Sequence, residues 1–268
     1  MDIWEERKRL RADKSRRNAD RAGRLCRCGD FYWKVLFGVL LIGLFTPVSS
    51  VLAYEERDSV HGGSIVGKVK FSGTAPPPRK LEISKDQDVC GRMEKSEESV
   101  VVGKDQGLQN VVVSLVNIHK GKRFSHAQSV LNQKDCLYTP HIVLVAPGTA
   151  LSILNSDGIL HSVHTHSEKN PPFNRAQSKF KKEIQETFLY PESIKLTCDV
   201  HSWMSGWIVV MDHPYFSVSE EDGSFKLLDV PPGNHTVQLW HETLGVRESS
   251  VVVRVNETFF VEVELGHE

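Results

Sequence analysis

The chain has 268 residues, of which 40% are hydrophobic and 25% are charged, and its formal net charge is −1. These values are typical of a globular protein and exclude collagen-like, coiled-coil and wholly disordered chains. The charge is uneven, because residues 1–34 carry eleven Lys or Arg against six Asp or Glu, net +5, and the remainder carries −6. A nucleic-acid binder needs a basic domain, so no nucleic-acid partner is expected.

Residues 1–53 have the features of an export signal. A basic stretch ends at Lys34, the uncharged run Val35–Phe45 follows, and small residues precede and include Ala53. This order is typical of a secretory signal peptide that is cleaved after Ala53. The alternative is an uncleaved membrane anchor, because 19 uncharged residues lie between Lys34 and Tyr54. Either way the positive flank stays inside, so we expect a periplasmic or extracellular protein that touches a membrane only through this segment if it is uncleaved.

The exported part predicts an all-β fold. Short β-branched or alternating segments are bounded mostly by Gly, Pro, Asn or Asp, which is typical of a sandwich or barrel. The polar and basic stretch Ser167–Gln185 is expected to be a long surface loop. The expected strands are Ile65–Phe71, Val100–Val102, Asn110–Val116, Ile142–Ala146, Ala150–Leu154, Ile194–Thr197, Trp207–Met211, Ser224–Leu228, His235–Trp240 and Ser250–Val255.

One short loop carries the chemistry. Cys198-Asp-Val-His201-Ser-Trp-Met204 places a thiol, an imidazole and a thioether within seven residues, directly after an expected strand. Copper that cycles between Cu(I) and Cu(II) takes two His, one Cys and a weak axial Met. The segment Asn155-Ser-Asp-Gly-Ile-Leu-His161 supplies the second imidazole, 37 residues before Cys198.

These two segments resemble the cupredoxin family of blue copper proteins, and the resemblance covers residues 100–212. In the amicyanin-like branch, Asn, five residues and His supply one ligand, and a Cys-x-x-His-x-x-Met loop supplies the other three. The resemblance implies a Greek-key cupredoxin sandwich. It also implies one type 1 copper site, and an electron path through the second histidine at an apolar surface. The implied ligands are His161, Cys198, His201 and Met204.

The sequence departs from the family at one position beside the site. Cupredoxins usually have Asn directly after the first histidine, where it ties the two ligand loops together, and here the residue is Ser162.

The cysteine count fits the resemblance. An odd number of cysteines in the exported part leaves one thiol over, and this part has Cys90, Cys136 and Cys198. Cys90 and Cys136 are expected to form a structural disulfide, which leaves Cys198 for the metal. The alternative is that Cys198 joins a disulfide.

Other residues near the loop have competing interpretations. His164 and His166 share one face of an expected strand, opposite His161, and are either a second metal site or solvated surface histidines. His141 is expected to be structural. Trp203 is expected to pack beside the copper loop, and a role as the point where electrons enter is the alternative.

Residues 213–268 resemble the carboxypeptidase regulatory-like domain, a small transthyretin-like β-sandwich. The similar segments are Asp222-Gly-Ser-Phe-Lys-Leu, Val230-Pro-Pro-Gly and Val237-Gln-Leu-Trp-His241. Within the leading strand and linker, residues 54–99, the stretch Gly67–Gly73 also looks like the first strand of that family. The cupredoxin-like unit is then inserted between this strand and the rest.

Three functions follow from these observations. The first is an exported, non-enzymatic type 1 copper protein that carries single electrons to a redox partner protein. The second is a copper-binding or delivery protein without a redox role, and the third is a structural β-sandwich surface protein without metal. The spectrum of bound copper distinguishes them.

Overall fold

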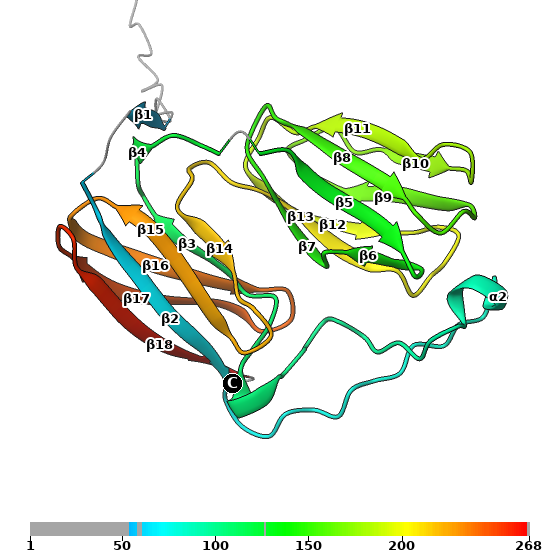
Figure 1. Cartoon of the computed structure of the whole chain (residues 1–268), viewed down its shortest axis with the longest axis horizontal. Helices are drawn as coiled ribbons and strands as arrows, with labels where there is room; N and C mark the ends of the chain where they lie inside the picture. The colour runs from blue at the N-terminus through cyan, green and yellow to red at the C-terminus, as the bar shows by residue number, and fades with distance from the viewer. Residues whose placement is uncertain (1–53, 58–60, 126, 267–268) are drawn as a thin grey trace, which may run out of the picture. The chain divides into compact units, whose positions relative to one another are not determined.

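The computed structural model describes residues 54–57, 61–125 and 127–266. The predicted signal or anchor, residues 1–53, lies outside these ranges. In the described part, no helix is both long and apolar enough to cross a membrane. Nearly all regular structure there is β-strand, as predicted (Figure 1).

One sandwich contains the candidate metal loop, Cys198–Met204. Its two sheets have the strand orders β10-β9-β12-β13-β7 and β11-β8-β5-β6. The strands are β5 (Ser129–Lys134), β6 (Leu137–Thr139), β7 (Ile142–Val145), β8 (Ala150–Asn155), β9 (His161–His166), β10 (Asn174–Gln177), β11 (Glu183–Thr187), β12 (Glu192–Thr197) and β13 (Ser205–Val210).

The other sandwich is built from both ends of the described chain. Its sheets have the orders β14-β3-β16-β17 and β15-β2-β18. The strands are β2 (Gly63–Phe71), β3 (Val112–Val116), β14 (Phe216–Val218), β15 (Ser224–Val230), β16 (Gly233–His241), β17 (Gly245–Val253) and β18 (Thr258–Leu265). In β2 burial alternates residue by residue, as a strand with one face on a core requires. The carboxypeptidase regulatory-like resemblance of this part stays a prediction.

The predicted start of the cupredoxin-like unit at residue 100 is wrong. β3 pairs with β14 and β16, so it belongs to the second sandwich, and the strands around the metal loop begin at Ser129. Within 100–102, Val102 makes one isolated bridge to Leu108 and no strand forms. Two strands therefore precede the insertion where one was predicted.

The predicted loop Ser167–Gln185 is also partly wrong. It contains all of β10 and the beginning of β11, which lie at the edges of the two sheets. Three of the four residues in β10 are exposed, so their polar side chains meet water as they would in a loop.

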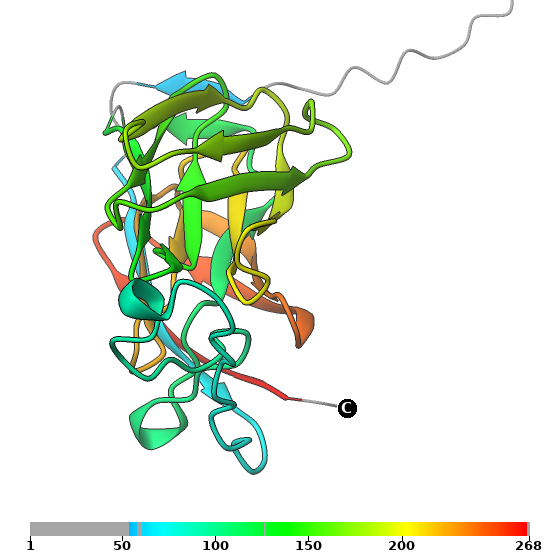
Figure 2. The same ribbon diagram turned by 90° about the vertical axis from the view of Figure 1, so that its right-hand side faces the viewer.

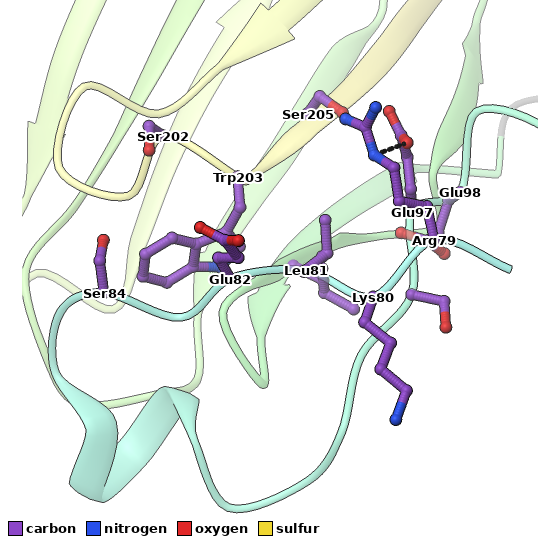
Figure 3. Close-up of a pocket in the computed structure, with 12 residues that line it drawn as sticks. Arg79, Lys80, Leu81, Glu82, Ser84, Glu97, Glu98, Ser202, Trp203 and Ser205 are labelled. Carbon is purple, nitrogen blue, oxygen red and sulfur yellow. Dashed lines mark ion pairs between the residues drawn. The ribbon is translucent and has the colours of Figure 1, made fainter.

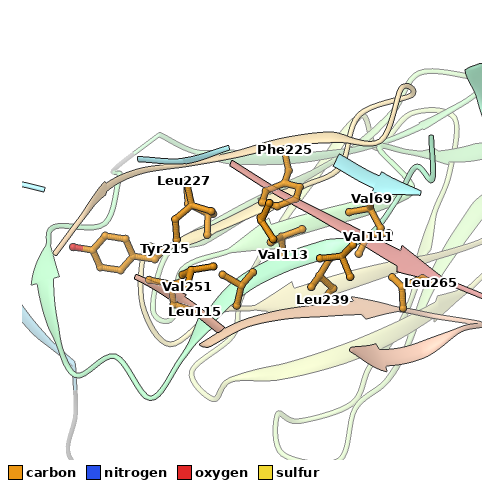
Figure 4. Packing of buried hydrophobic residues seen from close by; sticks show 14 of the residues in the cluster. Val69, Val111, Val113, Leu115, Tyr215, Phe225, Leu227, Leu239, Val251 and Leu265 are labelled. Atoms are coloured by element: carbon orange, nitrogen blue, oxygen red, sulfur yellow. The ribbon is translucent and has the colours of Figure 1, made fainter. Parts of the chain in front are cut away.

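Each sandwich has its own core. In the second sandwich, Val69, Val113 and Leu239 are fully buried between the sheets, together with the Tyr215 ring (Figure 4). In the first sandwich, Leu131, Ile153 and Ile208 are fully buried in the same cluster as Cys198 and Met204. The candidate metal loop is therefore attached to a close-packed apolar layer, which fixes side-chain positions.

Both views show the chain between β2 and β3 as mostly irregular (Figures 1 and 2). It carries α2 (Gln87–Cys90) and the 3-10 turn η1 (Lys104–Gln106). A disulfide joins Cys90 at the end of α2 to Cys136, as expected, with an S–S distance of 1.99 Å. The remaining short strands, β1 (Glu55–Arg57) and β4 (Lys120–Lys122), pair with each other.

Candidate metal centre

Two neighbouring strands bring the predicted ligands together. His161 is the first residue of β9, and Cys198 directly follows β12. The two strands pair antiparallel, with His164 opposite Thr197. The start of β9 therefore lies beside the end of β12, and the loop Cys198–Met204 begins next to His161.

Three of the four predicted ligands meet in one buried cluster. Nδ1 of His161 lies 3.0 Å from Nδ1 of His201, and Sγ of Cys198 lies 3.9 Å from Nδ1 of His201. The three ligand atoms all lie within 4.8 Å of one another. The side chains are buried, so the cluster is closed to bulk water.

Two carboxylates fix which nitrogen of each histidine faces the cluster. Nε2 of His161 donates to Asp157 Oδ2 over 2.8 Å, and Nε2 of His201 donates to Asp86 Oδ2 over 2.8 Å. In the neutral imidazoles the lone pairs are then on Nδ1, and the two Nδ1 atoms face each other at 3.0 Å. A proton on one of these nitrogens, or a metal ion between them, is needed for so short an approach. Histidine ligands of metals are commonly oriented by a carboxylate on the other nitrogen.

The spacing agrees with a coordination sphere. Two nitrogens that each lie about 2.0 Å from one metal ion at a tetrahedral angle are about 3.3 Å apart. The observed N···N distance of 3.0 Å is close to this value. One thiolate and two imidazoles suit copper or zinc, and a carboxylate-seeking ion such as magnesium would not choose them. The residues fit a copper ion.

The environment of Cys198 favours its thiolate form. Burial raises the pKa of the thiol, but hydrogen bonds from His161 and from the backbone N–H groups of Ser162, His201 and Val200 outweigh it, and the pKa falls to about 6. The thiolate is the form that binds metals. For His161, burial lowers the pKa, and the neighbouring Asp157 and Cys198 raise it above its ordinary value.

Ser162 ties the two ligand loops together, although the resemblance implied Asn at this position. Its backbone N–H lies 3.4 Å and its Oγ 3.7 Å from Cys198 Sγ, and its Oγ accepts from Asp199 N over 2.8 Å. A second connection comes from Tyr138, whose hydroxyl lies 2.6 Å from the carbonyl of Ser162 and 3.0 Å from that of Thr197. The hydroxyl of serine therefore does the bracing here.

Met204 lies at the end of the loop and is almost fully buried in the core cluster that also holds Cys198. Its backbone N–H donates to His201 O over 3.0 Å, which closes the loop as a tight turn. Its role as the axial ligand stays a prediction.

The prediction that His201 lies at an apolar surface is wrong. The side chain is fully buried, and its outer nitrogen donates to Asp86 at the start of α2. Cys90, at the other end of α2, is bonded to Cys136, so the disulfide holds this segment against the metal loop. We call Asp86 and α2 the cap on His201. These residues lie far outside the loop in the sequence, so the Cys-x-x-His-x-x-Met motif does not predict them.

A pocket lies beside the cap (Figure 3). The indole of Trp203 lines it, together with mostly polar and charged side chains of the segment 79–98, among them the ion pair Arg79–Glu97. The indole lies 5.0 Å from the ring of His201 and donates to the carbonyl of Cys136 over 3.2 Å. Trp203 therefore packs beside the loop, as expected.

The other singled-out histidines lie outside this cluster. His164 and His166 stack on each other with ring centroids 4.5 Å apart, and both are at least partly exposed. His141 is buried, with its Nε2 bonded to Glu242 and its Nδ1 3.7 Å from Glu98. These contacts suit the structural role expected of His141.

Sequence reasoning missed Asp86 and Asp157. Asp157 lies four residues before His161 within the ligand segment itself, and it also accepts from the backbone N–H groups of Asp135 and Cys136. Its spacing was a usable signal. Asp86 lies 115 residues before His201 and carries none. Asp157 and His161 also group with Cys136, but the sulfur of Cys136 is in the disulfide and offers no thiolate.

Comparison with known proteins gives matches among solved structures alone, since no family model and no curated protein matches the chain. A purple cupredoxin from Nitrosopumilus maritimus is 17% identical over 31% of this chain and 100% of that one, with a TM-score of 0.28. A reduced amicyanin variant is 18% identical over 33% of this chain and 87% of that one, with a TM-score of 0.29.

A copper-containing nitrite reductase from Thermus scotoductus SA-01 is 18% identical over 34% of this chain, with a TM-score of 0.30. The match spans only 24% of that enzyme. Because all three TM-scores are below 0.5, the functional interpretation rests on the strands and side chains of this chain.

Proposed function

We propose that the protein is an exported type 1 copper protein of the cupredoxin kind that carries single electrons. Cys198, His161 and His201 would hold the copper, with Met204 as the weak axial ligand. A copper ion in such a site supplies one-electron chemistry by alternating between Cu(I) and Cu(II). Export remains an expectation from residues 1–53, and the redox partner is a protein of unassigned identity.

One observation carries the proposal. Two imidazole Nδ1 atoms and a thiolate sulfur converge in a buried cluster, with both imidazoles oriented by carboxylates on their far sides. A purely structural β-sandwich has no need to bring two buried imidazole Nδ1 atoms to 3.0 Å of each other beside an unpaired cysteine. The geometry therefore favours a metal-binding function over a scaffold without metal.

The chain's own residues would limit movement when the copper changes oxidation state. Asp157 and Asp86 hold the two imidazoles, and Ser162 holds the sulfur and the Asp199 N–H. Ligands that are fixed from outside move little when the charge changes, which favours rapid electron transfer. The burial of all three ligand side chains favours retention of the ion over its release. Copper delivery therefore ranks behind electron transfer as the second candidate.

The test is a visible spectrum of the purified full chain after addition of copper(II). Cys26→Ser and Cys28→Ser in the background remove the thiols outside the described residues, so that Cys198 is the remaining unpaired cysteine. An intense thiolate-to-copper band with reversible redox cycling, absent after Cys198→Ser, supports the proposal. Bound copper without this band would point to delivery or storage. Absence of stoichiometric copper would leave the non-metal sandwich.

A further inference from the structure

We propose that His164 and His166 form a second, solvent-accessible site for a transition-metal ion such as Zn²⁺ or Cu²⁺. The two residues are separated by one position on β9 and lie on the same side of the strand. Their rings stack with centroids 4.5 Å apart and an interplanar angle of 29°. This site is distinct from the buried centre, because His161 on the same strand turns to the interior.

Hydrogen bonds leave one nitrogen of each ring for a ligand bond. Nδ1 of His164 donates to Asp199 Oδ1 over 3.0 Å, and a carboxylate only accepts, so the lone pair of this ring is on Nε2. Nε2 of His166 is 2.7 Å from Thr197 Oγ1, which leaves Nδ1 outside that bond. The other carboxylate oxygen of Asp199 accepts from Asn174, so Asp199 is held in place as an orienting group.

Electrostatics selects the kind of ion. A neutral imidazole nitrogen is a common ligand of zinc and copper. Lys195 pairs with His166 across the strand and lies at the same surface, so net charge alone attracts no cation here. An ion must therefore be held by ligand bonds from imidazole nitrogen, which favours zinc and copper over calcium and magnesium.

The exposure of the His164 and His166 side chains allows a bound ion to exchange with solvent. The side chain of His164 is 34% exposed and that of Asp199 is 51% exposed, and His166 is exposed as well. Two protein ligands leave the other coordination positions to water or to a second molecule. The inference does not depend on copper in the buried centre.

The experiment is a Zn²⁺ titration of the full chain, followed by imidazole NMR resonances, which report each histidine separately. We expect the resonances of His164 and His166 to shift saturably at one equivalent per site. His166→Ala, at a solvent-facing position, should weaken this response at least tenfold, and His164→Ala should act as a second variant of the same kind. His119→Ala, which removes an exposed histidine elsewhere, should leave it unchanged.

Shifts confined to His161 and His201, or equal shifts at all exposed histidines, would overturn the inference. Equal binding by wild type and His166→Ala would do the same. Failure of the buried copper centre shows separately, as a chain without the visible band whose His164 and His166 resonances still respond to Zn²⁺.

Discussion

Asp86 is the residue whose replacement tests the cap most directly. Asp86→Asn keeps the size of the side chain and removes its charge beside Nε2 of His201. Mutation of such an outer partner of a metal-bound histidine costs about 10- to 100-fold in metal affinity. Charge-assisted hydrogen bonds are roughly twice as strong as neutral ones, and the amide oxygen of Asn still accepts. The side chain of Asp86 is also 37% exposed, so solvent screens it. We therefore expect the lower end, about tenfold, which is about 1.4 kcal/mol.

The assay is competition for Cu(I) between the protein and a chromophoric chelator, with Asp88→Asn as the matched control. Asp88 is an exposed carboxylate of the same short helix, four-residue α2. An unchanged affinity in Asp86→Asn would refute the reasoning, because the carboxylate would then make no contribution to copper binding through His201. An equal loss in Asp88→Asn would refute it as well, since the effect would come from general charge.

Three further changes test other parts of the centre. Ser162→Ala removes an Oγ contact to the Cys198 sulfur, which costs the reduced, Cu(I) state about 1 kcal/mol of thiolate stabilisation. Voltammetry should therefore show a reduction potential about 40 mV lower, and an unchanged potential would contradict this. Joint replacement of Cys90 and Cys136 by Ser opens a 46-residue loop, so denaturant unfolding should show a loss of about 4 kcal/mol, and a loss below about 1 kcal/mol would contradict the tether. Burial raises the pKa of Asp157, but hydrogen bonds from His161 and two backbone N–H groups hold it below its ordinary value. Its stabilisation is therefore present above the unfolded pKa of about 3.9 and is lost as the pH falls through the folded pKa. Denaturant unfolding of the metal-free protein from pH 7 to pH 3 should show Asp157→Asn less stable near neutrality and the gap closing in acid, and a constant gap would count against this carboxylate.

The sequence predicts the parts of the centre that are local in the chain. The thiol and imidazole of the loop lie within four residues of each other. The segment that ends at His161 is recognisable from Asn155 at its start. Asn155 bonds to the carbonyls of Ile159 and Gln177 and shapes that turn. These features depend on chain geometry over a few residues, so a pattern can carry them.

The parts that depend on distant pairing were not predictable in the same way. β3 looks like any apolar strand, and its pairing with β16 is set by where more than a hundred intervening residues fold. The outer nitrogen of His201 is bonded to Asp86, which has no distinctive surroundings in the sequence. β10 was missed because three of its four side chains are exposed at the edge of the sheet, so its sequence is as polar as that of a surface loop.

The cap and the thiol together place a constraint on how the protein matures. In the described part, oxidation must join Cys90 to Cys136 and spare Cys198, although any two of the three thiols are chemically able to pair. In the folded chain Cys198 is almost fully buried, which shields it from the others. A chain that is oxidised before this sandwich closes can trap the wrong pair and lose the centre. Closure of the loop around Cys198 before oxidation therefore favours the disulfide that secures α2 over the two wrong pairs.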